Sequence, residues 1–227
     1  MENNSSISEK NPEKRIRIFS VYVSEEAVER VGATLRSGYL GEGPVVKEFE
    51  LALKKIGGMP YPVALNSGTS ALHLALVITG VKAQDEVITT AQTMMATGHA
   101  ILQQQARPVF ADIQYQTGNI GPGDIERRIT DKTKAIIVVH WAGYPCDLDE
   151  IHAIAKKHNL TVIEDAAHAL GAFYKSQPIG QISPFTCFSF QAIKHVTCGD
   201  GGALTVLTED KYREALRRRW YGIDRAL

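Results

Sequence analysis

Short apolar segments alternate with amphipathic segments along most of this chain, and this alternation limits the possible fold more than any other feature. The apolar segments have the length and the β-branched content of buried strands, and the segments between them repeat apolar residues at helical spacing. The expected strands are 62–65, 85–90, 108–111, 135–139, 161–163, 185–190 and 201–207. Strands that alternate with helices predict an α/β three-layer sandwich with a mostly parallel sheet.

The first residues differ in composition from the rest of the chain. Residues 1–14 are rich in Asn, Ser, Glu and Lys and nearly free of apolar residues, which predicts a disordered tail. Residues 15–23 alternate apolar and polar residues, which favours an edge strand. Ser24 then has the character of a helix cap, because acidic residues and helically spaced apolar residues follow it. We expect residues 15–227 to form one domain.

Lys194 follows the strand expected at 185–190 and precedes a glycine-rich turn. That strand alternates bulky apolar residues with small or polar ones, so it is predicted to be half-buried. A lysine beside apolar surface loses its proton more readily, and a free amine can attack a carbonyl to form a Schiff base. The alternative interpretation is an ordinary lysine on a turn with its charge in water.

Two carboxylates, Glu164 and Asp165, end the apolar strand that begins at Thr161, and His168 follows three residues later. Open α/β sheets place ligands at the carboxyl ends of their strands. Adjacent strand residues point to opposite faces, so only one of the two carboxylates can face a ligand there. His168 could equally be an ordinary histidine at the end of a strand.

A small polar turn, 66–70, joins the short strand at 62–65 to a strongly helix-forming segment. The free backbone N–H groups at a helix N-terminus can bind an anion. The hydroxyl of Ser189 could also reach such an anion. Alternatively, Ser67 or Thr69 is only a helix cap.

Four stretches of the sequence carry a resemblance to a known family. They read NSGTSALHLAL, VIEDAAHALGA, FSFQAIKH and GDGGAL, in this order. Together they closely resemble the sugar aminotransferases of the DegT/DnrJ/EryC1/StrS family, which are fold-type-I enzymes that use pyridoxal 5'-phosphate (PLP). The resemblance runs from about residue 18 to the last residue. It implies that residues 15–227 form an aspartate aminotransferase-like large domain that binds PLP.

The resemblance also assigns roles to single residues. Lys194 would be the catalytic lysine that holds PLP, and Asp165 would keep the pyridine nitrogen protonated. These are the two protein groups that PLP chemistry requires. A related branch of the family dehydrates sugars and has histidine in place of the lysine, so Lys194 argues against that branch.

The other implied cofactor contacts lie in three parts of the chain. Gly68, Thr69 and Ser189 match the positions that bind the cofactor phosphate, and His168 matches a position near the ring oxygen. Met94 occupies a position where the family usually has an aromatic residue stacked on the ring. A thioether can also lie against a π-face. The alternative is that Met94 belongs to the core.

The family resemblance implies transfer of an amino group from an amino acid, with glutamate as the expected donor, to a nucleotide-linked keto sugar. Such an enzyme would serve polysaccharide or secondary-metabolite sugar biosynthesis as a homodimer. Family members continue into a smaller C-terminal domain, which we expect to be absent here. The alternative function is therefore a truncated non-catalytic PLP-domain remnant or an interaction module.

Composition excludes several other classes of function. The 25 basic and 25 acidic residues give a formal net charge of zero, which does not favour a nucleic-acid partner. The three cysteines form no CxxC pair, so neither a structural metal site nor a disulfide framework is expected, and a reducing, cytoplasmic location is. No apolar run is long enough to cross a membrane.

Overall fold

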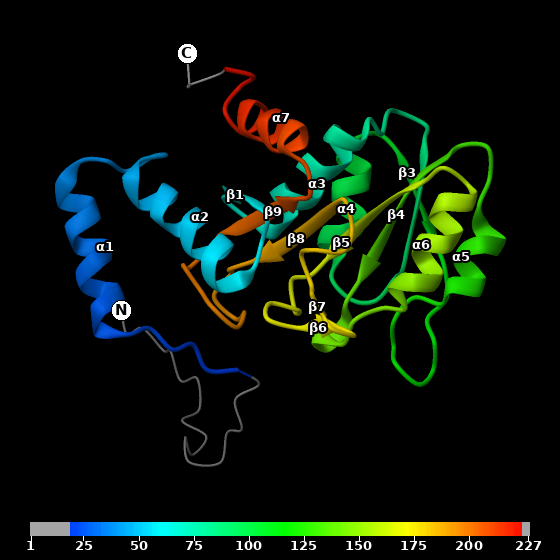
Figure 1. The fold of residues 1–227 in the computed structure, drawn as a ribbon, viewed down its shortest axis with the longest axis horizontal. Coiled ribbons are helices and arrows are strands. Elements are labelled where there is room, and N and C mark those ends of the chain that lie inside the picture. The colour runs from blue at the N-terminus through cyan, green and yellow to red at the C-terminus, as the bar shows by residue number, and fades with distance from the viewer. Residues whose placement is uncertain (1–18, 224–227) are drawn as a thin grey trace, which may run out of the picture.

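The computed structural model describes residues 19–223, so the tail predicted for residues 1–14 lies outside the described residues. Its centre is a seven-stranded sheet with helices on both faces (Figure 1). Across the sheet, the strands occur in the order β1 (Tyr61–Leu65), β9 (Gly202–Val206), β8 (Phe185–Ser189), β5 (Thr161–Asp165), β4 (Thr133–Val139), β2 (Glu86–Thr89) and β3 (Arg107–Phe110).

The sheet is mostly parallel, as predicted. β3, β2, β4, β5 and β8 pair in parallel, whereas β9 runs antiparallel to both of its neighbours, β8 and β1. Parallel neighbours need long crossover connections, whereas antiparallel neighbours can be joined by a local loop. Helices lie in these crossovers except in the one from β5 to β8, residues 166–184, which contains no helix. The predicted α/β fold class is therefore confirmed, and β9 returns directly beside β8.

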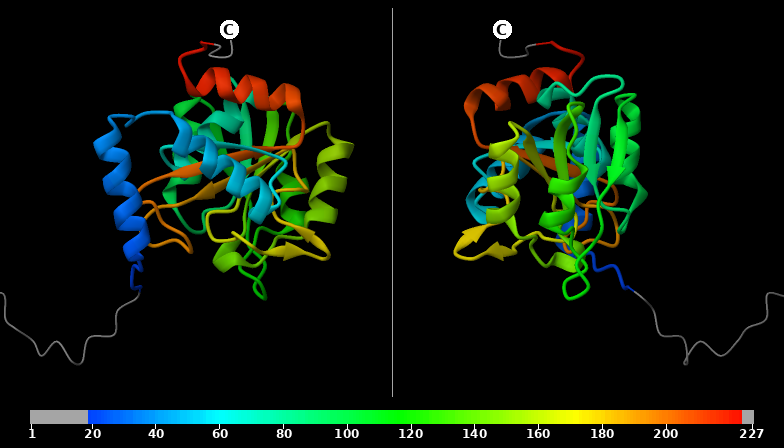
Figure 2. Two further views of the ribbon diagram at one scale, coloured as in Figure 1. Left: turned by 60° about the vertical axis from the view of Figure 1, so that its left-hand side comes forward. Right: turned by 90° about the vertical axis from the view of Figure 1, so that its right-hand side faces the viewer.

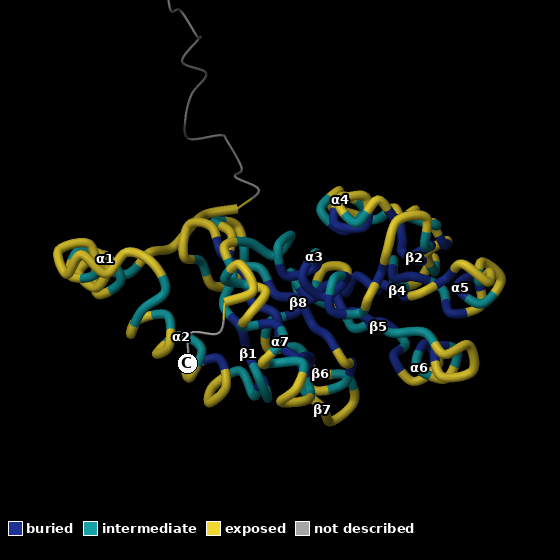
Figure 3. The backbone as a smooth tube through the Cα atoms, turned by 90° about the horizontal axis from the view of Figure 1, so that it is seen from above, coloured by how far each residue is buried: buried dark blue, intermediate teal, exposed yellow. Residues whose placement is uncertain are grey.

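Two layers of helices enclose the sheet. Against one face pack α3 (Gly68–Thr79), α4 (Met95–Gln103) and α7 (Glu209–Arg219), and against the other pack α2 (Pro44–Gly57), α5 (Pro122–Arg128) and α6 (Leu148–Lys157). Seen from above, α4 and α6 lie on opposite sides of the strands (Figure 3). Among the described residues, no helix combines the length and apolar character needed to cross a membrane.

The central strands are buried on both faces because each face has its own helical layer. In β4, Ala135 and Ile137 belong to the core beneath α3 and α4, whereas Ile136 and Val138 belong to the core beneath α5 and α6. β8 is likewise buried from residue 185 to residue 188. The expectation of a half-buried strand at 185–190 is therefore wrong, because polar residues in β8 also lie under helices.

Helix α1 (Glu25–Ser37) begins and ends where the sequence predicts. The Ser24 hydroxyl accepts a hydrogen bond from the Ala27 N–H, and Gly38 ends the helix in a left-handed conformation. The helix buries none of its residues and lies apart from the sheet (Figure 2). Within the expected edge strand, residues 19–23 form no strand, because they are mostly exposed and have no neighbouring strand to pair with.

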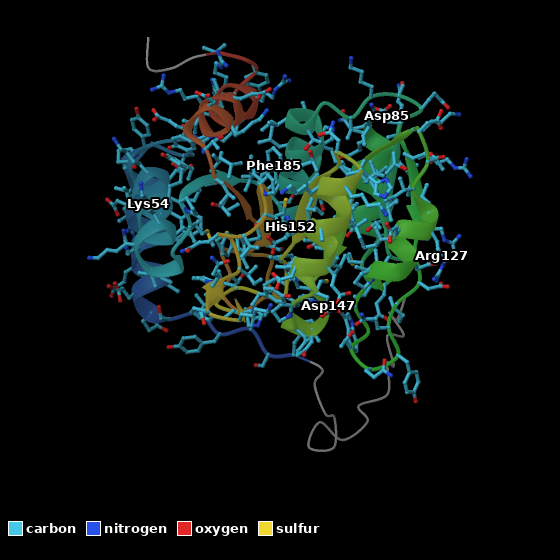
Figure 4. The ribbon with its side chains drawn as sticks, turned by 45° about the vertical axis from the view of Figure 1, so that its right-hand side comes forward. Lys54, Asp85, Arg127, Asp147, His152 and Phe185 are labelled. Atoms are coloured by element: carbon cyan, nitrogen blue, oxygen red, sulfur yellow. The ribbon has the colours of Figure 1, made fainter. Side chains whose placement is uncertain are left out.

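A short antiparallel ribbon of β6 (Phe173–Tyr174) and β7 (Gln177–Pro178) lies between β5 and β8 in the chain. This ribbon is not predictable from the sequence, because two-residue strands are too short to show a periodic pattern. The side chain of Phe185 lies in the interior at the start of β8, whereas Lys54 and Arg127 lie on opposite flanks of the molecule (Figure 4).

The carboxyl ends of three parallel strands meet at one edge of the sheet. Val139 of β4 pairs with Asp165 of β5, which pairs with Cys187 of β8. Farther along β8, Ser189 pairs with Gly202, which in turn pairs with Leu65 at the end of β1. This register brings the starts of four connecting loops together, where open α/β sheets bind ligands.

Replacement of Ile137 by alanine tests the two-sided core. Ile137 is fully buried in β4, and we expect I137A to lower the free energy of unfolding by about 3 kcal/mol through lost burial and a residual cavity. Urea unfolding monitored by circular dichroism would measure the change. The control V28A, on the exposed face of α1, should change stability by less than about 0.5 kcal/mol. Equal effects would contradict the described packing.

Candidate active site

A cavity of about 250 Å³ opens at the carboxyl edge of the sheet. It lies between the N-terminus of α3, the segment that enters α4, and the loops that follow β5 and β8. The cavity is lined by all seven residues that the family resemblance assigns to cofactor binding, namely Gly68, Thr69, Met94, Asp165, His168, Ser189 and Lys194. These residues come from four separate segments, so the fold brings together what the sequence keeps apart.

A larger cavity of about 1030 Å³ lies elsewhere, beside α2, β1 and the end of α7. Its lining includes His73, Arg219 and Trp220 but neither Lys194 nor Asp165. Size alone would favour this cavity as a binding site. We assign the candidate active site to the smaller cavity, because a lysine, a buried carboxylate and a helix N-terminus converge there.

Lys194 lies in the loop between β8 and β9, where its backbone N–H donates to the Gln191 carbonyl at 2.8 Å. Its side chain is partly buried in the cavity. Burial lowers the pKa of the Lys194 ammonium, and the negative charge of Asp165 opposes that shift. A larger fraction of this lysine is therefore a free amine near neutral pH than for an exposed lysine.

Asp165 is the last residue of β5, and 6% of it is exposed. One carboxylate oxygen, Oδ2, accepts a hydrogen bond from the hydroxyl of Thr97 at 2.7 Å. The other, Oδ1, accepts from the backbone N–H of Ala167 at 3.2 Å. Hydrogen bonds to both oxygens fix the orientation of this carboxylate.

Glu164 points to the opposite face of β5 and cannot share the cavity with Asp165. Its Oε2 accepts a hydrogen bond from His140 Nε2 at 2.7 Å, and both side chains are fully buried. The other ring nitrogen of His140 accepts from the Cys146 N–H, so the proton lies on Nε2. Burial raises the pKa of Glu164, but the hydrogen bonds from His140 and Ser183 outweigh burial, so the pKa lies below its ordinary value.

The turn before α3 presents unsatisfied backbone donors to the cavity. Ser67 caps the helix, because its hydroxyl accepts from the Ser70 N–H and its carbonyl accepts from the Ala71 N–H. The first N–H groups of a helix have no partner within the helix, so those of Gly68 and Thr69 remain for a ligand. Ser67 is thus a cap, and its capping leaves the next two residues free to bind an anion.

Two glycines make this turn fit against the neighbouring strands. A Cβ atom on Gly68 would lie 3.0 Å from the Cβ of Ser189, and one on Gly202 would lie 2.3 Å from the carbonyl carbon of Ser67. Larger residues would therefore push the α3 N-terminus away from Ser189. The close approach places the Ser189 side chain beside the first turn of α3, where its hydroxyl and the free N–H groups of the helix can bind the same anion.

His168 and Met94 reach the cavity from different parts of the chain, the loop after β5 and the segment before α4. Burial, reinforced by the positive charge of Lys194, lowers the pKa of His168, so its imidazole is mostly neutral near pH 7. Met94 precedes α4, and its side chain is 66% exposed. The interpretation of Met94 as a core residue is therefore wrong for the described chain, since no element covers it.

Two residues that support the site, Thr97 and His140, are not identifiable from the sequence pattern alone. Thr97 lies in α4 and reaches Asp165 across 68 residues of sequence, and His140 reaches Glu164 from the end of β4. No local pattern identifies a threonine in a helix as a partner of a distant carboxylate. For His140, its place after an apolar strand is the one signal that could have suggested a role.

Comparison with protein families gives one match to nearly the whole chain. The model of the DegT/DnrJ/EryC1/StrS aminotransferase family matches residues 21–226. Among curated proteins, the chain is 44% identical to the spore coat polysaccharide biosynthesis protein SpsC of Bacillus subtilis, over 83% of this chain and 48% of that protein. The chain spans about half the length of the curated relatives it matches.

Solved structures that share the fold include three proteins whose sequences are 33–37% identical to this chain. The sugar aminotransferase CalS13 from Micromonospora echinospora is 37% identical, with a TM-score of 0.89 over 94% of this chain and 60% of that chain. The PLP form of Spr1654 from Streptococcus pneumoniae is 37% identical, with a TM-score of 0.84 over 89% and 57%. DesI, solved with its TDP-sugar product, is 33% identical, with a TM-score of 0.83 over 92% and 53%.

Replacement of Glu164 by glutamine tests the buried pair. The glutamine NH2 group would face either the His140 or the Ser183 donor, which bind different oxygens of Glu164, so E164Q should lose about 3 kcal/mol of stability at pH 7. Because the folded pKa of Glu164 is lower than its ordinary 4.5, the wild-type advantage should be complete above pH 4.5 and shrink as the pH falls through the folded value. Urea unfolding at several pH values would measure both effects.

Glu48→Gln is the matched control for this experiment. Glu48 forms an exposed ion pair with Arg30, so E48Q should change stability by less than about 1 kcal/mol. An E164Q protein as stable as E48Q at neutral pH would contradict the role given to the buried pair.

Proposed function

This chain belongs to the DegT/DnrJ/EryC1/StrS aminotransferase family, and from that premise we propose that it is a PLP-dependent sugar aminotransferase. Its proposed reaction moves an amino group from an amino acid to a keto sugar carried on a nucleotide. The observation that carries the proposal is the meeting of Lys194, Asp165 and the α3 N-terminus around one cavity. A general ligand-binding cavity would not need all three groups.

The residues around the cavity fit PLP part by part. The N–H groups of Gly68 and Thr69, together with the Ser189 hydroxyl, form an anion site suited to the cofactor phosphate. Asp165 offers a buried, doubly hydrogen-bonded carboxylate for the pyridine nitrogen. When bound, PLP supplies an electron-accepting ring that weakens the bonds at the α-carbon of an attached amine.

Lys194 has the properties of the residue that binds the cofactor aldehyde and then moves protons. Its lowered pKa leaves an amine able to attack a carbonyl and later to accept the α-proton of the substrate. The carboxylate of Asp165 would balance the positive charge of the ring nitrogen and oppose the loss of its proton. His168, largely neutral, can contact the ring without adding charge.

The proposed class of substrate is inferred from what the names of two similar proteins state. SpsC acts in spore coat polysaccharide biosynthesis, and DesI was solved with a TDP-sugar. We propose a nucleotide-linked keto sugar as acceptor and glutamate as donor, in polysaccharide or related sugar biosynthesis. The three cysteines are free, which supports a reducing, cytoplasmic location.

We further propose that the active protein is a homodimer. Met94, Met95 and Ile193 expose apolar surface at or next to the open side of the cavity. Large exposed apolar side chains around a binding site are typical of a surface that another protein covers. A second copy seated there would also exclude water from the reacting groups. Light scattering would test this proposal, and a stable monomer would contradict it.

The assignment of Lys194 can be tested by reductive labelling. Purified protein incubated with PLP should show a visible absorption band that disappears on borohydride reduction, and peptide mapping should find the pyridoxyl group on Lys194. K194A should lose both the band and the specific label, because no other lysine among residues 19–223 lines the cavity. A label distributed over surface lysines in the wild-type protein would contradict the proposed function.

The matched control for this labelling is Lys175→Ala. Lys175 is exposed, and its hydrogen bond to Asp149 raises its pKa, so its amine is protonated and unreactive near neutral pH. K175A should therefore label like the wild-type protein. Loss of label in K175A would point to general instability of the variants instead of a specific lysine.

Replacement of Asp165 by asparagine tests the proposed partner of the ring nitrogen. D165N keeps the shape of the side chain but removes the charge that keeps the nitrogen protonated, so amino transfer should slow on the order of a hundredfold. Stopped-flow absorbance with glutamate would measure the rate of the first half-reaction. D149N, on the exposed start of α6, is the control, and an unchanged rate in D165N would refute the assignment.

A further inference from the structure

Thr97 makes a buried hydrogen bond to Asp165, the proposed partner of the ring nitrogen. Its hydroxyl lies 2.7 Å from Asp165 Oδ2, and the exposed fractions of the two residues are 2% and 6%. An ionised carboxylate can only accept, so the hydroxyl of Thr97 donates. The two residues lie 68 positions apart in sequence, on α4 and at the end of β5.

Thr97 does not itself line the cavity, although its neighbour Ala96 does. Any effect of Thr97 on a bound molecule must therefore pass through Asp165. The backbone N–H of Ala167 holds the other oxygen of the same carboxylate at 3.2 Å. Donors from two different elements thus fix the plane of the carboxylate and leave its remaining lone pairs directed at the cavity.

Other buried threonines show that this contact is not a general result of packing. Thr89 and Thr205 are 0% and 1% exposed, and within the described residues their hydroxyls have no hydrogen-bond partner. This core therefore tolerates threonine hydroxyls without a carboxylate beside them. The placement of Thr97 against Asp165 is a specific feature of α4.

We propose that Thr97 is a positioning residue that orients Asp165 toward the ring nitrogen of PLP. This inference rests on the proposed function, because it concerns the same cavity. Without the hydroxyl, Asp165 would retain one fixed oxygen and could rotate about its side-chain bonds. Its attraction for a protonated ring nitrogen would then weaken, whereas the phosphate site and Lys194 would be unaffected.

The test compares two ligands and four proteins. The ligands are PLP and an analogue in which a C–H group replaces the ring nitrogen. The proteins are the full wild-type chain, T97V, T97S and the control T205V. Valine has the shape of threonine without the hydroxyl, and serine keeps the hydroxyl. Dissociation constants would be measured by fluorescence or absorbance titration, which does not require turnover.

T97V should weaken PLP binding about tenfold, the effect of one lost hydrogen bond to a charged group. Binding of the ring-carbon analogue should change by less than about twofold, because this ligand has no nitrogen for Asp165 to hold. T97S should bind both ligands nearly as well as the wild-type protein. T205V removes a hydroxyl without a partner, so it should match the wild-type protein for both ligands.

Three results would overturn the role of Thr97: no loss of PLP affinity in T97V, an equal loss for both ligands, or failure of T97S to restore binding. An equal loss would show a general effect on cavity structure. Each of these outcomes leaves the proposed function intact, since the wild-type protein still binds PLP. A wild-type chain that binds neither ligand would instead overturn the proposed function, and the role of Thr97 with it.

Discussion

The opposite orientation of Glu164 and Asp165 at the end of β5 is the constraint on which the rest of the site depends. Side chains alternate along a strand, so two adjacent carboxylates cannot both enter the same cavity. His140 and Ser183 bind Glu164 on the buried face, which anchors the strand end. Asp165 is thereby directed to the other face, where the cavity, Lys194 and the α3 N-terminus meet.

The structure also ties α2 and α7 to the edge of the sheet. Arg219, in the final turn of α7, lies 2.5 Å from both Glu42 and Glu50 and donates to the Ala64 carbonyl at 3.1 Å. It is the last of three consecutive arginines in the final turn of α7. Ala64 lies in β1, the strand that leads into the α3 turn. Arg219 therefore stabilises this strand without lining the cavity that contains Lys194.

The fold could be predicted from the sequence because its signal is local and repeated. Apolar strands and helically spaced residues alternate from β1 to α7, and caps such as Ser24 and Gly38 mark real helix ends. The site residues could be named because they lie in continuous motifs. The features that could not be predicted include the burial of β8, the unpaired residues 19–23 and the contact of Thr97 with Asp165. Each depends on which elements become neighbours in space.

The connection between β8 and β9 has a consequence for how the site is assembled. These strands are antiparallel neighbours, so the loop with Lys194 closes between segments that are close in sequence, at a small cost in chain entropy. Thr97 and Asp165 meet only after α4 and several crossovers have packed, which is a contact of long sequence separation. The lysine is thus held by local structure, whereas the acid reaches its working orientation only in the completed fold. Binding competence therefore depends on the long-range packing of α4 against the end of β5 as well as on the local loop.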